Sequence, residues 1–349
     1  MSDFRFIDLF AGIGGIRLPY QNLGGTCVFS SEIDKYAIET YKENFHETPS
    51  GDITKIKEED IPKFDILLAG FPCQAFSVAG KKLGFEDTRG TMFFEVVRIL
   101  KYHMPLAFHL ENVKGLITHN KGETFKTMLN ILENDLGYKV FWKVLNAMDY
   151  GVPQHRNRVM IVGFKNQNAN FSFPKPYTNK VILGDILEKN VSSKYTISDK
   201  LWAGHQRRKE ENKAKGKGFG YNLYTESSSH TVTLSARYYK DGSEILIKQK
   251  DNNPRKLTPR ECARLQGFPD NYILPNISDC HLYKQFGNSV PTKMIGEVAK
   301  EIIKELERLG DLKWLILHVM KTWIFLSKIV CYFILFWRCW YNVKYQKTN

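Results

Sequence analysis

Residues 4–163 alternate short apolar runs with longer segments of helical periodicity, and no other feature restricts the fold of this chain so strongly. A strand, a crossover helix and a parallel strand, repeated several times, produce such an alternation. The chain therefore predicts an α/β fold with a doubly wound sheet, mixed but mostly parallel. The expected strands are 4–10, 26–31, 64–69, 106–110, 139–146 and 159–164, with helices at 34–44 and 92–103 between them.

The pattern changes after Phe164, where an asparagine-rich stretch and two prolines predict a domain boundary. Residues 165–270 are expected to form a second, smaller domain, mainly irregular and β. Within it, Thr258-Pro259-Arg260-Glu261 indicates a capping box that begins a short helix. A last helix at 292–309 ends at Gly310, so residues 1–164 plus 271–310 are expected to form one discontinuous domain.

Residues 311–349 differ from the rest of the chain, because they are dense in aromatic and aliphatic side chains. Their longest charge-free run, 329–337, is well short of the roughly 20 apolar residues that span a bilayer. We therefore expect no membrane span there. An interfacial helix and a fused or out-of-frame tail outside the fold remain alternatives.

The chain is basic, with 50 Lys and Arg against 37 Asp and Glu and a net charge of +13, which suits a protein that meets a polyanion. Basic residues cluster at 200–217, and a solvated face is as good an interpretation there as a phosphate-contacting loop. The six cysteines form no CxxC pair, so neither a disulfide framework nor a zinc site is indicated. No secretion signal is recognisable at the N-terminus, and a cytoplasmic protein without a metal is expected.

A glycine-rich turn follows the first expected strand, in Phe10-Ala11-Gly12-Ile13-Gly14-Gly15. Such a turn lets backbone approach a nucleotide-like ligand, but Arg17 replaces the third glycine of a dinucleotide fingerprint. Glu32, at the end of the next strand, can accept hydrogen bonds from ribose hydroxyls, and Asp52 can accept one from an adenine amine. For both acids, plain helix capping is an equal alternative.

Three polar elements are expected at one edge of the sheet. Cys73, in Gly70-Phe71-Pro72-Cys73-Gln74, directly follows a buried strand, and Glu111 ends the next one. Most lone cysteines are buried hydrophobes, but a loop position after Pro72 favours a reactive one. Arg156 and Arg158 alternate along an extended segment, so they can converge on one anionic or carbonyl group; a pair of surface arginines is the alternative.

Together these motifs closely resemble the C5-cytosine DNA methyltransferases, in particular the compact bacterial enzymes of restriction-modification systems. Seven segments match in order, and the resemblance covers about residues 4–309. They are residues 6–12, 70–74, 84–90, 111–113, 154–158, 255–269 and 285–290. The resemblance implies a Rossmann-like methyltransferase fold, S-adenosylmethionine as cofactor, and a cytosine flipped out of double-stranded DNA as substrate.

The resemblance also implies roles for individual residues. Cys73 would add to carbon 6 of cytosine, Glu111 would act at ring nitrogen 3, and Arg158, with Arg156 by analogy, would hold the base oxygen and backbone. Ile33 departs from the pattern, because close relatives carry an aromatic residue there, and this weakens stacking on the adenine. The implied cofactor residues are Phe10, Gly12, Gly14, Gly15, Glu32, Ile33, Asp52, Ile53, Pro72, Met92, Asn288 and Ser289. The implied DNA contacts are Gln74, Ser77, Arg89, Thr233 and Arg237. Tyr238 and Tyr239 are further candidates, although a β-hairpin around 241–242 explains the tyrosines equally well.

Three other functions are considered. A nicotinamide dehydrogenase would have no use for Cys73 paired with Glu111 and two arginines. A non-catalytic DNA-binding protein on the same scaffold would not need an intact Cys73. A transfer-RNA-methylating branch of the family exists, but the size and basicity of residues 165–270 favour DNA. A monomer is expected, with a restriction endonuclease of the same specificity as a functional partner.

Overall fold

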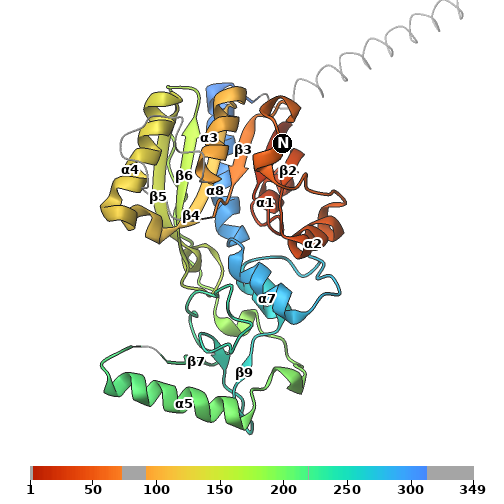
Figure 1. The fold of residues 1–349 in the computed structure, drawn as a ribbon, viewed down its shortest axis with the longest axis vertical. Helices are drawn as coiled ribbons and strands as arrows, with labels where there is room; N and C mark the ends of the chain where they lie inside the picture. The colour runs from red at the N-terminus through yellow and green to blue at the C-terminus, as the bar shows by residue number, and fades with distance from the viewer. Residues whose placement is uncertain (1–2, 73–91, 219, 313–349) are drawn as a thin grey trace, which may run out of the picture.

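A computed structural model of the protein describes residues 3–72, 92–218 and 220–312. Its main body is a six-stranded sheet in the order β2-β1-β3-β4-β6-β5 (Figure 1). The strands follow the expected positions closely. They are β1 (Phe4–Leu9), β2 (Gly25–Ser31), β3 (Ile66–Ala69), β4 (Ala107–Val113), β5 (Lys139–Asn146) and β6 (Asn157–Phe164).

Strands β1 to β4 are parallel, whereas β6 is antiparallel to both β4 and β5, so the predicted mixed, mostly parallel sheet is confirmed. The connection from β5 to β6 contains only the short 3-10 turn Ala147–Tyr150. Parallel neighbours need a crossover of a dozen or more residues, so β6 must run back along β5. Its amino-terminal end therefore lies at the edge where the parallel strands end, with Arg158 opposite Val113.

Strand β4 is longer than the sequence predicted. It continues three residues beyond the expected end at Leu110, because Glu111, Asn112 and Val113 pair with β6. Glu111 thus belongs to the strand rather than to the loop that follows it.

Helices cover both faces of the sheet, as in a doubly wound fold. On one face α1 (Arg17–Asn22) and α8 (Thr292–Leu309) pack against β1 and β3. On the other face lie α3 (Met92–His103) and α4 (Glu123–Asn130), the latter continued by the π-helical turn Ile131–Asp135. Helix α2 (Lys35–Phe45) begins as predicted, since the Asp34 side chain accepts from the amides of Tyr36 and Ala37.

Helix α8 brings the C-terminal part of the chain back to the first strands. Met294, Ile295, Val298 and Ile302 are fully buried in the same cluster as Phe4 and Phe6. The helix ends at Gly310 in the left-handed conformation, as predicted. Residues of the first strand and of this late helix therefore share one core.

Below the sheet in Figure 1 lies a smaller, less regular region. A three-stranded sheet of β7 (Leu223–Tyr224), β8 (Leu246–Ile247) and β9 (Arg255–Lys256) is followed by α6 (Pro259–Leu265) and α7 (Asp279–Asn288). The capping box at Thr258 and Glu261 is confirmed, with each side chain bonded to the other residue's amide. The predicted domain boundaries are not tested by these observations and stay predictions.

Two expectations for this region are wrong. Residues 199–214 form a helix, α5 (Asp199–Ala214), capped by Ser198, where the sequence suggested no helical pattern. Its periodicity is hidden because most of its side chains are exposed and polar, and His205 alone among them is buried. No hairpin forms around residues 241–242, and Tyr238 is fully buried, with its hydroxyl donating to the carbonyl of Ile245.

A third core cluster joins the smaller region to the main body. It contains Ala37 and Phe45 of α2 together with Leu234, Tyr238 and Phe286. Within the described ranges, none of the helices is long and apolar enough to cross a bilayer. The tail predicted to lie outside the fold falls, from residue 313 onward, outside the described residues.

Candidate active site

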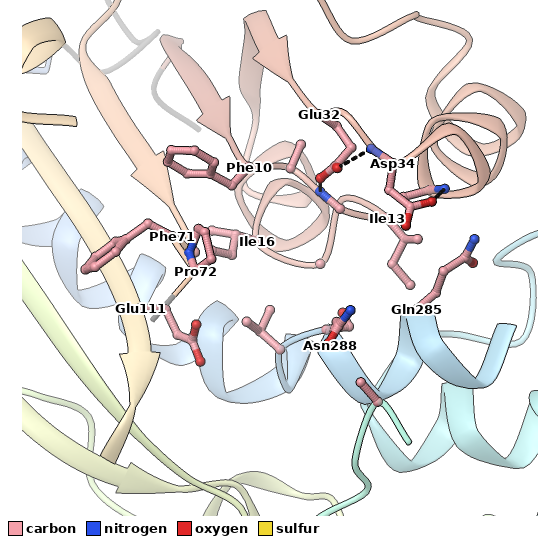
Figure 2. Close-up of a pocket in the computed structure, with 18 of the residues that line it drawn as sticks. Phe10, Ile13, Ile16, Glu32, Asp34, Phe71, Pro72, Glu111, Gln285 and Asn288 are labelled. Carbon is pink, nitrogen blue, oxygen red and sulfur yellow. Dashed lines mark hydrogen bonds between the residues drawn. The ribbon is translucent and has the colours of Figure 1, made fainter. Parts of the chain in front are cut away.

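A pocket of about 850 Å³ opens at the edge where the parallel strands end. Glu32, directly after β2, and Glu111, on β4, both line this pocket, with Glu111 below Pro72 in Figure 2. The pocket brings together most of the residues that the sequence singled out. These are Phe10, Gly12, Gly15, Glu32, Ile33, Asp52, Ile53, Pro72, Met92, Glu111, Arg156, Arg158, Thr233, Asn288 and Ser289.

The glycine turn has the backbone that its composition predicts. Gly12 and Gly14 have φ values of +55° and +74°, a region that favours glycine. Gly14 does not line the pocket: a Cβ there would lie 2.2 Å from the ring of Phe45. Gly14 therefore shapes the turn from behind, and a direct contact with the cofactor stays a prediction.

The Glu32 carboxylate is held in place by three backbone amides. It accepts hydrogen bonds from Gly12 at 2.7 Å and from Ile33 and Asp34 at 2.8 Å each. A carboxylate offers about four acceptor positions, so one remains for a ligand hydroxyl. Ile33 lines the pocket but is 74% exposed, consistent with weak stacking at this position.

Asp52 caps a 3-10 turn and also lines the pocket, while its role toward adenine stays a prediction. Its carboxylate accepts from the hydroxyl of Thr54 at 2.8 Å and from the Thr54 amide at 3.1 Å, capping a 3-10 turn. These hydrogen bonds lower the pKa of Asp52, so it is an anion at neutral pH. The same residue lines the pocket, where its exposed side can accept from an amine.

Glu111 and Arg158 form a largely buried ion pair in the pocket wall. The Arg158 Nε lies 2.9 Å from Oε1 of Glu111, and the two side chains are 12% and 9% exposed. Burial raises the pKa of Glu111, while Arg158 and Arg156 oppose that shift. The result is a carboxyl group that holds a proton more readily than an exposed glutamate and is fixed in direction by an arginine.

Arg156 and Arg158 both line the pocket, but their hydrogen bonds go to different groups, so convergence on one ligand group stays a prediction. The Arg156 guanidinium donates to the carbonyls of Leu234 at 2.9 Å, Gly287 at 3.0 Å and Ser289 at 2.6 Å. The residue is only 1% exposed, which also excludes the surface-pair alternative. Burial and the adjacent Arg158 lower the pKa of Arg156 to about 9, which leaves it charged at neutral pH. Arg156 thus holds three chain segments together at the pocket.

The segment around Thr233 is also hydrogen-bonded to residues next to Arg156. The Thr233 hydroxyl donates to the carbonyl of His155 at 2.8 Å, and the Leu234 amide donates to Gln154 at 2.9 Å. The backbone of Ser235 packs directly against Gly287. Only glycine leaves room for this approach, because a Cβ at residue 287 would lie 2.3 Å from the carbonyl oxygen of Ser235. Arg237 is exposed and does not line the pocket.

The backbone leading to Cys73 passes beside Glu111. The side-chain amide of Asn112 donates to the carbonyl of Phe71 at 2.8 Å, and a Cβ on Gly70 would lie 3.6 Å from Oε2 of Glu111. Cys73 and the expected DNA contacts Gln74, Ser77 and Arg89 lie outside the described residues.

Several pocket residues were not predicted, among them Asp8 and Gln285. Asp8 lines the pocket from β1, and Gln285 lines it from α7, with hydrogen bonds to Thr40 and Tyr36 of α2. An acidic residue inside the apolar run 6–10 was a signal that could have identified Asp8. Among the described residues, no group of three or more histidine, cysteine or acidic side chains could hold a metal ion.

Comparison with known proteins agrees with this geometry. The profile of the family described as C-5 cytosine-specific DNA methylase matches residues 4–304. The Type II methyltransferase M1.ScrFI of Lactococcus lactis subsp. cremoris is 60% identical over 312 residues, which cover 88% of this chain and 80% of that protein. The Type II methyltransferase M.DsaV of Dactylococcopsis salina is 55% identical over 309 residues, covering 88% of each chain.

Solved structures show the same fold. The crystal structure of S. pombe Dnmt2 methyltransferase superposes with a TM-score of 0.71 at 20% identity and covers 88% of this chain and 99% of its own.

Proposed function

This chain belongs to the C-5 cytosine-specific DNA methylase family, and on that premise we propose that its pocket binds S-adenosylmethionine next to a cytosine extruded from duplex DNA. The observation that carries the proposal is the pocket itself. It brings together Phe10, Glu32 and Asp52, which would bind the nucleoside, and the ion pair of Glu111 and Arg158, which would bind the base.

The pocket fits the proposed cofactor. Its volume of about 850 Å³ lies within the range of small-molecule sites. Glu32 retains an acceptor position for a ribose hydroxyl, and anionic Asp52 can accept from the adenine amine. When bound, S-adenosylmethionine supplies an electrophilic methyl group on a sulfonium centre.

The protein residues activate the other reactant. Carbon 5 of cytosine is a weak nucleophile, and addition of the Cys73 thiolate at carbon 6 makes it an enamine carbon that can attack a methyl group. Negative charge then builds on the ring, and Glu111, whose pKa is raised by burial, donates a hydrogen bond or proton to nitrogen 3. Arg158 orients Glu111 and donates to the base oxygen. Transfer of the carbon 5 proton to a water molecule and release of the Cys73 thiolate from carbon 6 would complete the reaction.

The relatives named above are Type II methyltransferases, and we propose that this chain likewise serves in a restriction-modification system. It would act as a cytoplasmic monomer that protects DNA from an endonuclease of the same specificity. The smaller region that contains Thr233 and Arg237 would read the DNA. The basic charge of the chain, +13, suits that substrate.

A methyl-transfer assay tests the proposal. Tritiated methyl groups from S-adenosylmethionine should pass to duplex DNA and not to transfer RNA, and Cys73→Ser should abolish the transfer. Cys280→Ser, at an exposed cysteine, is the matched control and should retain activity. Transfer to RNA alone, or transfer that survives Cys73→Ser, would refute the assignment.

A trapping experiment tests the covalent step separately. Duplex DNA with 5-fluorocytosine at the target position lacks the proton that must leave, so the complex should persist as an adduct that survives denaturing electrophoresis. Peptide mapping should place the adduct at Cys73. Absence of an adduct in the presence of cofactor would contradict nucleophilic addition.

A further inference from the structure

The glycine turn that follows β1 contains a peptide unit whose two polar groups are both hydrogen-bonded. The Gly14 amide donates to the carbonyl of Ala11 at 2.8 Å. The carbonyl of Ile13, the other half of the same peptide unit, accepts from the hydroxyl of Tyr272 at 2.5 Å. Because a peptide unit is planar, these two hydrogen bonds determine its orientation. Tyr272 thus links the turn directly to a segment 259 residues further along the chain.

The composition of the turn makes this restraint important. Gly12 and Gly14, on either side of Ile13, both have positive φ values, and glycine populates several backbone regions at similar energy. The peptide units between them can therefore rotate at little cost unless a partner holds them. Ile13 itself lines the pocket (Figure 2), so a rotated unit would change the wall that faces the ligand. Within the turn, Glu32 holds the amide of Gly12, and Tyr272 holds the carbonyl of Ile13.

Tyr272 is itself firmly held. Its side chain is 3% exposed, and its ring packs on Phe268 with 4.6 Å between the ring centroids. The next residue, Ile273, is bound to α2 by two hydrogen bonds. Its amide donates to the side chain of Asn44 at 2.7 Å, and its carbonyl accepts from the same side chain at 2.9 Å. The hydroxyl of Tyr272 therefore reaches the turn from a fixed position.

We propose that Tyr272 is a positioning residue for the cofactor, because its hydroxyl holds the glycine turn in the conformation that receives S-adenosylmethionine. The inference rests on the proposed function, since it assumes that this cofactor binds beside the turn. Tyr272 does not line the pocket, so it acts through Ile13. An ordered turn raises the fraction of molecules that are ready to bind, and the apparent dissociation constant is inversely proportional to that fraction.

The kinetics of methyl transfer separate this role from a purely structural one. In Tyr272→Phe the ring still packs on Phe268, but the carbonyl of Ile13 loses its partner. The dissociation constant and the KM for S-adenosylmethionine should rise about 3- to 10-fold, as expected for one neutral hydrogen bond. The kcat on duplex DNA should stay within about twofold, because bound cofactor selects the correct turn before the chemical step.

Tyr138→Phe is the matched control. Tyr138 is 2% exposed and lies outside the pocket lining, and its hydroxyl donates to the carbonyl of Pro105 at 2.9 Å. Both variants lose one buried hydrogen bond from a tyrosine to a backbone carbonyl, so their midpoints in urea denaturation should fall by similar amounts. Only Tyr272→Phe should also weaken cofactor binding.

Equal changes in cofactor affinity in the two variants, including no change in either, would show that Tyr272 serves only the stability of the fold and would overturn the inference. A lower kcat at an unchanged KM in Tyr272→Phe would overturn it as well. Should Tyr272→Phe fail to fold, Asn44→Ala frees Ile273 from α2 and should raise the same KM; an unchanged KM then overturns the inference. A wild-type protein that binds no S-adenosylmethionine would instead refute the proposed function.

Discussion

Arg156 offers the sharpest test of how the pocket is held together. Its guanidinium donates to three carbonyls on two other segments, that of Leu234 and those of Gly287 and Ser289 at the end of α7. Arg156→Met fills a similar volume but leaves these acceptors unpaired. Each buried acceptor left unpaired lowers the stability by about 1–3 kcal/mol. Part of this loss is offset, because the variant no longer buries a charge that is repelled by Arg158. We expect a net loss of about 3–5 kcal/mol in the free energy of unfolding, as for other broken buried charge contacts.

Urea denaturation followed by circular dichroism measures that loss. Arg156→Lys keeps the charge but cannot reach three acceptors with a planar fork, so its stability should fall between those of the wild type and Arg156→Met. Arg207→Met is the matched control, because Arg207 is 77% exposed and its removal should leave the denaturation midpoint unchanged. Gly287 and Ser289 line the pocket, so Arg156→Met should also weaken cofactor binding.

The opposite pattern would refute this reasoning. If Arg156→Met changes stability by less than about 1 kcal/mol and leaves cofactor affinity intact, but lowers kcat by two orders of magnitude, Arg156 acts on the substrate directly and is not a positioning residue.

Three further predictions concern stability. Gly287→Ala should destabilise the protein by about 1–3 kcal/mol in urea denaturation, since its Cβ would lie 2.3 Å from the backbone oxygen of Ser235; an unchanged midpoint would contradict that close approach. Burial lowers the pKa of His109 to about 3, so between pH 6.5 and 3 the unfolded chain binds a proton that the folded chain does not. Stability should therefore fall as the pH falls, with a contribution from His109 of about 1.3 kcal/mol between pH 7 and 5.5, and His109→Gln should remove that part of the slope. Thr258→Ala breaks a capping box and should cost about 1 kcal/mol by the same assay, whereas Thr258→Ser should be close to neutral.

Local sequence signals predicted most of the main body. Strand β5 and helices α3 and α8 have the bounds that their apolar patterns predict, because a buried face must repeat with the period of its element. Helix α5 was not predicted, because an exposed polar helix has no apolar face whose period the sequence could reveal. The positions of Glu32 and Glu111 at strand ends also followed from the sequence, because parallel strands present their carboxyl ends at one edge.

What the sequence determined by itself is therefore the set of chemical groups and the strands that carry them. Only the tertiary structure decided which groups meet. The antiparallel direction of β6 places Arg158 next to Glu111 rather than at the far edge of the sheet, and the burial of Arg156 makes it a link between three segments. The hydrogen bond from Tyr272 to the glycine turn is likewise invisible in the sequence. Strand direction, burial and hydrogen-bond partners depend on contacts between residues far apart in the chain, and local patterns carry little information about them.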